Sequence, residues 1–126
     1  MKTIVKKRQY GSIKYYEFES FDEMMKDDVL SYLAQGDGYH GILDIYTDDK
    51  SIIAEKAVYE NWYTNEDGKK VDKVYYIPSL EVREKYNIYD GGIECYPLSE
   101  LPEDRKEYPV DSELLSYVSN KPWNLE

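Results

Sequence analysis

The hydrophobic pattern of the first 20 residues predicts a β-hairpin. Apolar or aromatic side chains recur between polar ones in residues 3–10 and 13–19, and Gly11 and Ser12 lie between the two runs. Glycine at the first central position of a two-residue loop suits a type II′ turn. We therefore expect two antiparallel strands joined by Gly11-Ser12.

The next segment has helical periodicity. Ser20-Phe21-Asp22-Glu23 has the Ser-x-x-Glu form of a capping box, which marks a helix start. Apolar residues then recur at spacings of three to five, which predicts one main helix over about 21–35 that ends in a left-handed conformation at Gly36. The apolar stripe is Phe21, Met24, Met25, Leu30 and Leu33, and the residues expected to face water are Lys26, Asp27 and Asp28.

Three further apolar runs predict an antiparallel β-meander over about 42–77. The expected strands are residues 42–47, 52–64 and 70–77, and polar turns separate them. The last run carries an aromatic residue on both alternating faces. One face should meet the helix, and the other should form a surface that carries tyrosines.

Past Pro78 the pattern weakens. Residues 79–86 can form a short helix before the turn Asp90-Gly91-Gly92, and prolines interrupt the acidic stretch after Cys95. We expect an irregular C-terminal region with one or two short helices, the second at about 111–119. With no internal repeat and no linker, the prediction is a single α+β domain over residues 1–126.

Composition adds the expectation of a binding surface. The chain has 15 tyrosines against two phenylalanines, and tyrosine is enriched where one end of a side chain stays wet, as at protein interfaces. A hydrophobic fraction of 41% is too high for a disordered chain. The single Cys95 excludes an internal disulfide, and no apolar run has the length of a membrane helix, so we expect a cytoplasmic protein in a bacterial host cell.

Charge is unevenly distributed along the chain. Residues 1–16 contain five basic groups and no acidic one, whereas the remainder contains 11 basic and 26 acidic groups. Such an anionic body should repel nucleic acid and membranes and attract a basic protein partner. The simpler interpretation is that the acidity serves solubility.

Three constellations suggest chemistry, and none is specific. The stretch Gly36–Gly41 has the letters G-x-G-x-x-G, but it follows a helix and precedes a strand, which reverses the order of a dinucleotide-binding loop. His40 and Cys95 are the single histidine and cysteine, and no nucleophile signature surrounds Cys95. The acidic clusters lack the spacing of a calcium loop. We therefore expect no catalytic residue, cofactor or metal.

The remaining constellation interleaves aromatic and acidic residues over residues 46–49, 59–67 and 86–90. Carboxylates at intervals can imitate a phosphate backbone, and Tyr and Trp can anchor Arg and Lys side chains. Strand alternation would put Tyr59 and Tyr63 on one face and Glu60 and Trp62 on the other, with Trp62 either exposed or in the core. The candidate partner-binding residues are Asp48, Asp49, Tyr59, Glu60, Trp62, Tyr63, Glu66 and Asp67.

In size, acidity and lack of a catalytic signature, the chain is similar to small phage and mobile-element inhibitors of host nucleases, including anti-CRISPR and antirestriction proteins that imitate DNA. The similarity implies a protein-binding inhibitor that is not an enzyme and does not bind nucleic acid itself. One alternative is an immunity or accessory protein for a basic partner. A second alternative is a small hydrolase that uses a carboxylate pair or Cys95 with His40.

Overall fold

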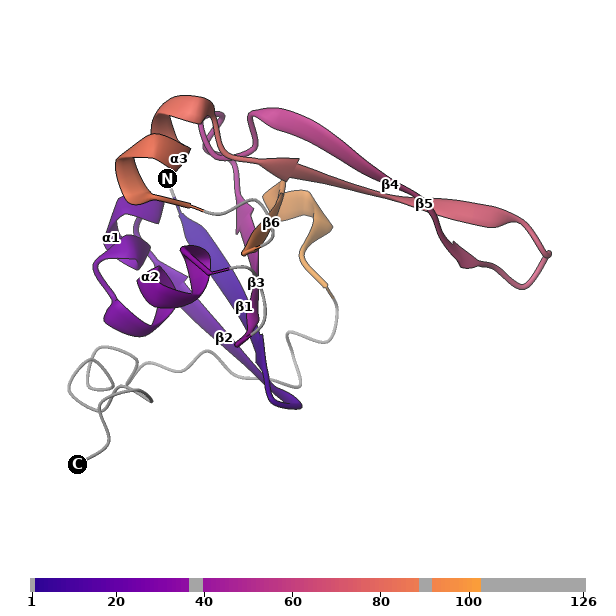
Figure 1. Cartoon of the computed structure of the whole chain (residues 1–126), viewed down its shortest axis with the longest axis horizontal. Coiled ribbons are helices and arrows are strands. Elements are labelled where there is room, and N and C mark those ends of the chain that lie inside the picture. The colour runs from indigo at the N-terminus through magenta and orange to yellow at the C-terminus, as the bar shows by residue number, and fades with distance from the viewer. Residues whose placement is uncertain (1, 37–39, 89–91, 103–126) are drawn as a thin grey trace.

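One six-stranded sheet organises the molecule (Figure 1). The computed structural model of the chain describes residues 2–36, 40–88 and 92–102. The strands are β1 (Thr3–Gln9), β2 (Ser12–Phe18), β3 (Ile42–Thr47), β4 (Glu55–Thr64), β5 (Lys70–Ile77) and β6 (Ile93–Tyr96). The helices are α1 (Phe21–Met25), α2 (Asp28–Ala34), α3 (Leu80–Tyr86) and the 3₁₀ turn η1 (Leu98–Glu100).

The strand order is β2-β1-β3-β6-β5-β4, and every neighbouring pair is antiparallel except β3 with β6. The predicted α+β class and N-terminal hairpin are confirmed. The strands of the expected meander lie close to their predicted positions, but β3 is not hydrogen-bonded to β4. Instead β6 lies between β3 and β5, so a strand from the C-terminal part of the chain joins the two halves of the sheet.

The main core lies between the sheet and helices α1 and α2. It takes alternate residues from the central strands and the apolar faces of both helices. Val5, Leu43, Ile45 and Cys95 are fully buried on this side of the sheet. The other members of the cluster are Tyr16, Phe21, Met24, Met25, Val29, Leu30, Leu33, Ala34, Ile52, Ile88 and Ile93.

A second, smaller core lies on the opposite face of the sheet. Ile4, Tyr15 and Tyr46 are buried there, and Tyr96 stacks on Tyr46 with ring centroids 5.3 Å apart. Leu98, at the start of η1, packs against this cluster. Tyrosine was expected mainly at the surface, but Tyr15, Tyr16 and Tyr46 are core residues. Tyr16 packs in the main core, and Tyr15 and Tyr46 pack on the opposite face of the sheet.

The N-terminal hairpin turns one residue earlier than predicted. Gln9 pairs with Ser12, so the loop residues are Tyr10 and Gly11, with φ values of 50° and 78°. Positive φ at both central positions defines a type I′ turn and not the predicted type II′ turn. The twist of a type I′ turn matches that of the flanking strands, and this outweighs the preference of Tyr10 for negative φ.

The predicted main helix is two helices. The chain breaks at Asp27, which takes an extended conformation and caps α2: one carboxylate oxygen accepts from the N–H groups of Val29 and Leu30 at 2.9 and 3.0 Å. Asp27 is therefore fully buried, contrary to the expectation that it faces water. Ser20 does cap α1, accepting from Glu23 N–H at 3.1 Å. Gly36 is not left-handed, because α2 ends at Gln35 in the right-handed region.

The C-terminal part of the described chain contains a strand that the prediction missed. The predicted helix over residues 79–86 is confirmed as α3, and Ser79 caps it. Residues 93–96 form β6, a strand that the sequence did not predict. The predicted turn at Asp90-Gly91-Gly92 falls largely outside the described residues, and the predicted helix at 111–119 lies wholly outside them. No helix in the described ranges is long and apolar enough to cross a membrane.

Asp27→Ala should lower the free energy of unfolding by about 1–2 kcal/mol, because it removes the cap of α2. Asp27→Asn keeps an acceptor oxygen and should cost less. Chemical denaturation of the three proteins at neutral pH measures both effects. Equal losses in the two variants would show that the cap is not what Asp27 contributes.

The same aspartate should give the folded protein a pH-dependent stability. Burial raises the pKa of Asp27, so its contribution is full below the unfolded value of about 3.9 and is lost as pH rises through the folded value. The stability of the wild type relative to Asp27→Asn should thus fall as pH rises from acid to neutral. A constant difference across that range would contradict the raised pKa.

Candidate functional site: an aromatic face on a projecting hairpin

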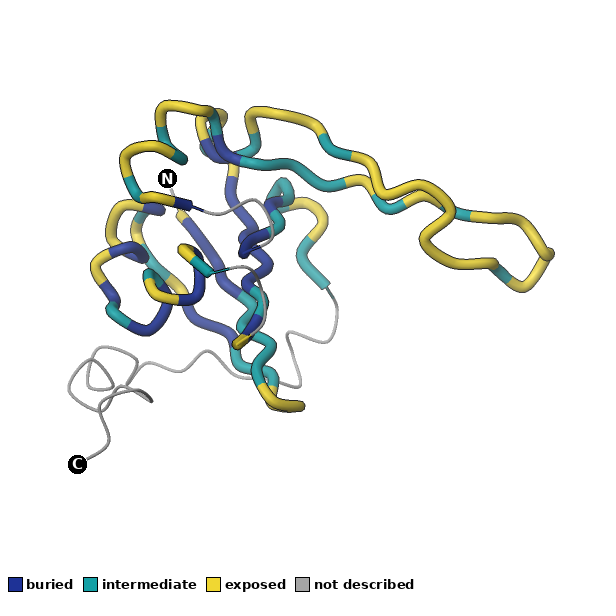
Figure 2. Tube along the Cα trace, in the orientation of Figure 1, coloured by how far each residue is buried: buried dark blue, intermediate teal, exposed yellow. Residues whose placement is uncertain are grey.

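Strands β4 and β5 form a hairpin that projects from the body of the protein, and we call Glu55–Ile77 the arm (Figure 1). β5 pairs with β6 only at Tyr76 and Cys95, so the rest of the hairpin has no sheet neighbour on that side. Nearly every residue of β4 is exposed (Figure 2). The arm is thus a two-stranded ribbon held at one end.

A β-bulge interrupts β4 midway along the arm. Tyr59 pairs with Lys73 and Tyr63 pairs with Val71, so three residues of β4 lie opposite Asp72 alone. At the bulge Asn61 has a φ of 55°, and its N–H donates to the Asp72 carboxylate at 2.9 Å. Bulges increase the local twist and redirect side chains, and they are common beside functional sites.

The bulge moves Trp62 to the same side of the arm as Tyr59. Their rings make an edge-to-face contact with centroids 4.9 Å apart. Lys73, the cross-strand partner of Tyr59, places its Nζ 4.6 Å from the centroid of the Trp62 ring. The expectation that Trp62 faces away from Tyr59 is therefore wrong, because simple alternation does not pass through a bulge. Trp62 is also not in the core, since 49% of it is exposed.

We call Tyr59, Trp62, Tyr63 and Lys73 the aromatic face. Tyr63 belongs to it because its partner Val71 lies two residues from Lys73 on the same side of β5. Both T-shaped ring pairs and an ammonium group over an indole ring are favourable geometries. These contacts hold the exposed rings of Tyr59 and Trp62 in position relative to each other.

Lys73 also ties the aromatic face to the body. Its Nζ lies 2.8 Å from a carboxylate oxygen of Glu94 on β6, and the Tyr96 hydroxyl donates to the same oxygen at 3.0 Å. The Lys73 and Glu94 side chains are only 20% and 23% exposed, so solvent screens this pair less than a surface pair. Lys73 is therefore one side chain that connects the arm to the central strands.

A second charged pair continues this row across the sheet. Glu94 lies beside Asp44 on β3, and Arg8 on β1 donates to Asp44 at 3.0 Å. Burial raises the pKa of Asp44, the nearby Arg8 opposes that rise, and the negative charge of Glu94 adds to it. Burial also raises the pKa of Tyr96. Arg8 and Lys73 thus flank the two carboxylates, which are engaged in ion pairs that join four strands.

The structure separates the eight predicted partner-binding residues into two groups. Tyr59, Glu60, Trp62, Tyr63, Glu66 and Asp67 all lie on the arm. Asp48 and Asp49 lie before β4, in the turn at the opposite end of that strand. There one Asp49 oxygen accepts from the N–H and hydroxyl of Ser51, at 3.0 and 2.8 Å, so Asp49 stabilises its own turn.

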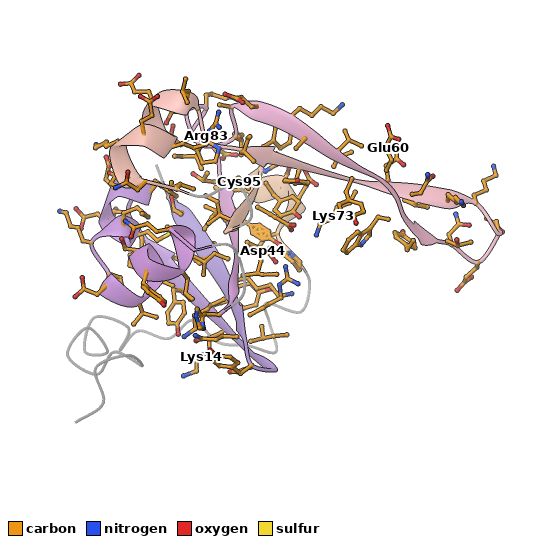
Figure 3. The ribbon with its side chains drawn as sticks, in the orientation of Figure 1. Lys14, Asp44, Glu60, Lys73, Arg83 and Cys95 are labelled. Atoms are coloured by element: carbon orange, nitrogen blue, oxygen red, sulfur yellow. The ribbon has the colours of Figure 1, made fainter. Side chains whose placement is uncertain are left out.

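Within the arm, Glu60 and the tip acids do not belong to the aromatic face. Figure 3 shows Glu60 and Lys73 pointing to opposite sides of the hairpin. Glu66 and Asp67 lie in the exposed turn between β4 and β5, where Asn65 accepts from the N–H groups of Asp67 and Lys69. The arm as a whole contains five acidic and four basic residues, whereas residues 17–54 contain ten acidic and two basic ones. The acidic excess is therefore greater in the segment that contains α1 and α2 than in the arm.

Cys95 and His40 lie in different surroundings. Cys95 is fully buried in the main core, and burial raises the pKa of its thiol. His40 is exposed, and its Nδ1 lies 3.1 Å from the Tyr10 hydroxyl. Among the described residues, no group of three or more His, Cys, Asp or Glu side chains could hold a metal ion.

Sequence reasoning missed Lys73, Glu94, Asp44 and Arg8. Lys73 was visible as one of three charged residues in the strand over 70–77, but its partner lies on β6, which the sequence did not predict. Comparisons with protein-family models, with curated proteins and with solved structures found no match for this chain. The class of the protein is thus defined by its own structure, an α+β domain with a projecting aromatic hairpin.

Lys73→Gln should expose the Trp62 ring, because the ammonium group no longer covers it. In a Trp123→Phe background Trp62 is the only indole, and acrylamide quenching of its fluorescence should increase. Glu94→Gln should have a smaller effect in the same direction. Lys73 can still cover the ring, but it no longer has the ion pair that helps to hold its ammonium group there. Lys70→Gln, on the same strand, is the control. Identical quenching in all four proteins would contradict the proposed role of Lys73.

Proposed function

We propose that this chain is a protein-binding protein and that the aromatic face of the arm is its contact surface. The observation that carries the proposal is the exposure of three large rings on one projecting element: 56% for Tyr59, 49% for Trp62 and 54% for Tyr63. Tyr and Trp are the residues that most often dominate binding energy at protein interfaces.

The geometry of the arm favours binding over a purely structural role. The Trp62 ring contacts Tyr59 and Lys73, and Tyr59, Trp62 and Tyr63 belong to neither hydrophobic core. Side chains that are already fixed lose less conformational entropy when a partner binds. A ribbon of this form can enter a groove that a flat surface cannot reach.

The acidic segment indicates the charge of the partner. Residues 17–54 carry a large excess of carboxylates, and a field of that sign accelerates encounter with a basic protein. We propose more specifically that the partner is a nucleic-acid-targeting nuclease and that the chain is an inhibitor of the anti-CRISPR or antirestriction type. Imitation of nucleic acid would then fall to the acidic segment, because the charges of the arm nearly balance.

A plasmid-interference assay tests the specific proposal. The chain is expressed in bacteria that carry one of a panel of RNA-guided or restriction nucleases, and transformation by a targeted plasmid is counted. Inhibition of one nuclease should raise transformation toward that of an untargeted plasmid. If no nuclease in the panel is inhibited or bound, the inhibitor proposal fails, and an immunity or accessory protein for another basic partner takes its place.

Substitutions on the aromatic face should weaken binding to that nuclease without unfolding the protein. Trp62→Ala should cost about 2 kcal/mol or more of binding free energy, expressed mainly as faster dissociation. Tyr59→Ala and Tyr63→Ala should weaken binding with melting temperatures close to the wild type. Tyr32→Ala, an exposed tyrosine outside the arm, is the matched control. Unchanged affinity in all three arm variants would exclude the aromatic face as the contact surface.

The acidic turns should act mainly on association. Glu66→Gln with Asp67→Asn removes charge at the arm tip, and Asp48→Asn with Asp49→Asn removes it at the other end of β4 while keeping the acceptor that caps the turn. Each pair should slow association and reduce its salt dependence, with a smaller change in dissociation. Association rates from surface plasmon resonance at several salt concentrations measure this. If neither pair alters the rate, the acidity serves only solubility.

A further inference from the structure

The outer edge of β4 has no neighbouring strand in the described sheet. β4 is the last strand in the order, and it pairs on one side only, with β5. An edge strand leaves alternate N–H and C=O groups free to pair with another strand, and proteins usually block such an edge with a bulge, a proline or charges. Here Tyr59 makes the last regular pair with β5 and Glu60 is the first of the three bulge residues, so the edge is regular from Glu55 to Tyr59 and becomes left-handed only at Asn61.

We propose that β4 pairs antiparallel with β4 of a second copy of this chain, centred on Val58. This pairing has a two-fold axis perpendicular to the sheet, so each contact occurs twice. It joins the two arms edge to edge. It goes beyond the proposed function, because it concerns the outer edge of β4 and a second copy of the chain, and not the aromatic face and a different protein.

The charges along β4 favour this alignment. Centring on Val58 places Lys56 opposite Glu60 of the second copy, and Glu60 opposite its Lys56. Both residues are exposed, and among the described residues neither forms an ion pair within the chain. Opposite charges directly across two strands stabilise their pairing. Two such pairs therefore flank the axis.

Side-chain size on the two faces of the ribbon agrees with the same alignment. On one face Val58 meets Val58 of the second copy beside the cross-strand partner Val74, and these valines are 46% and 41% exposed in the single chain. On the other face Ala57 lies opposite Tyr59 of the second copy, so a small residue makes room for a large one. The pairing would cover exposed apolar surface that the single chain leaves in water.

Neighbouring alignments lose these matches. Centring on Ala57 places Lys56 opposite Val58, and centring on Tyr59 places Glu60 opposite Val58. Both leave the charges without partners. The bulge ends the pairing beyond Glu60, because the left-handed Asn61 cannot continue a regular ladder. The central alignment is the one that the sequence of β4 and its bulge both support.

Charge reversal provides the test. Sedimentation equilibrium is run over a concentration series of roughly 1 μM to 1 mM, which covers weak to moderate interfaces. The mass of the wild type should rise toward twice that of the chain. Lys56→Glu alone and Glu60→Lys alone should remain monomeric, because each places like charges opposite one another. An equimolar mixture of the two should dimerise, because one chain then carries two negative charges at positions 56 and 60 and the other carries two positive charges opposite them.

The double variant that carries both reversals should also dimerise, and Glu66→Lys at the arm tip is the control, with its dimer retained. Cysteine cross-linking with oxidised glutathione then locates the axis: Val58→Cys should form a covalent dimer and Val74→Cys, one strand inward, should not. A monomeric wild type at every concentration would overturn the proposal and leave the edge free for a strand of another protein. A dimer that survives both single reversals would overturn it as well.

Discussion

The insertion of β6 between β3 and β5 is the constraint on which the rest of the structure depends. Four residues join the N-terminal three strands, through parallel pairing with β3, to the arm. The strand enters beside the end of α2, where a Cβ at Gly92 would lie 2.5 Å from the carbonyl oxygen of Gly36 and 2.6 Å from that of Ala34. Only glycine fits such an approach, so Gly92 allows the helical layer and the sheet to close together.

The same insertion explains which parts of the fold could be predicted. Local signals were sufficient for the hairpin at the N-terminus, for the short helix α3 and for the positions of β3, β4 and β5. They were not sufficient for β6, because a four-residue strand after a glycine turn has too little periodicity to distinguish it from a loop. The error in strand order followed from that omission, because without β6 the simplest arrangement of three consecutive strands is a meander.

The candidate site shows a related limit. The residue types of the aromatic face were visible in the sequence, and its three rings were among the residues expected to bind a partner. Their arrangement was not visible, because a bulge of two extra residues at Asn61 changes the face on which Trp62 lies. Asp27 is similar: an aspartate within an apparently continuous helical stripe gave no sign that it begins a second helix. In both cases the backbone conformation of one residue interrupts a periodic pattern, the alternation of a strand at Asn61 and the helical repeat at Asp27.

Because the arm is attached at its base and contributes little to either core, its outer half is free of the packing requirements that restrict the rest of the chain. Substitutions in the exposed outer half of the arm should therefore disturb the folding of the body less than substitutions in β6, which pairs with β3 and β5 and contributes Ile93 and Cys95 to the main core. Sequence changes can therefore accumulate on the proposed contact surface while the supporting sheet keeps its packing. Under the proposed function, this division would let recognition change without loss of the fold.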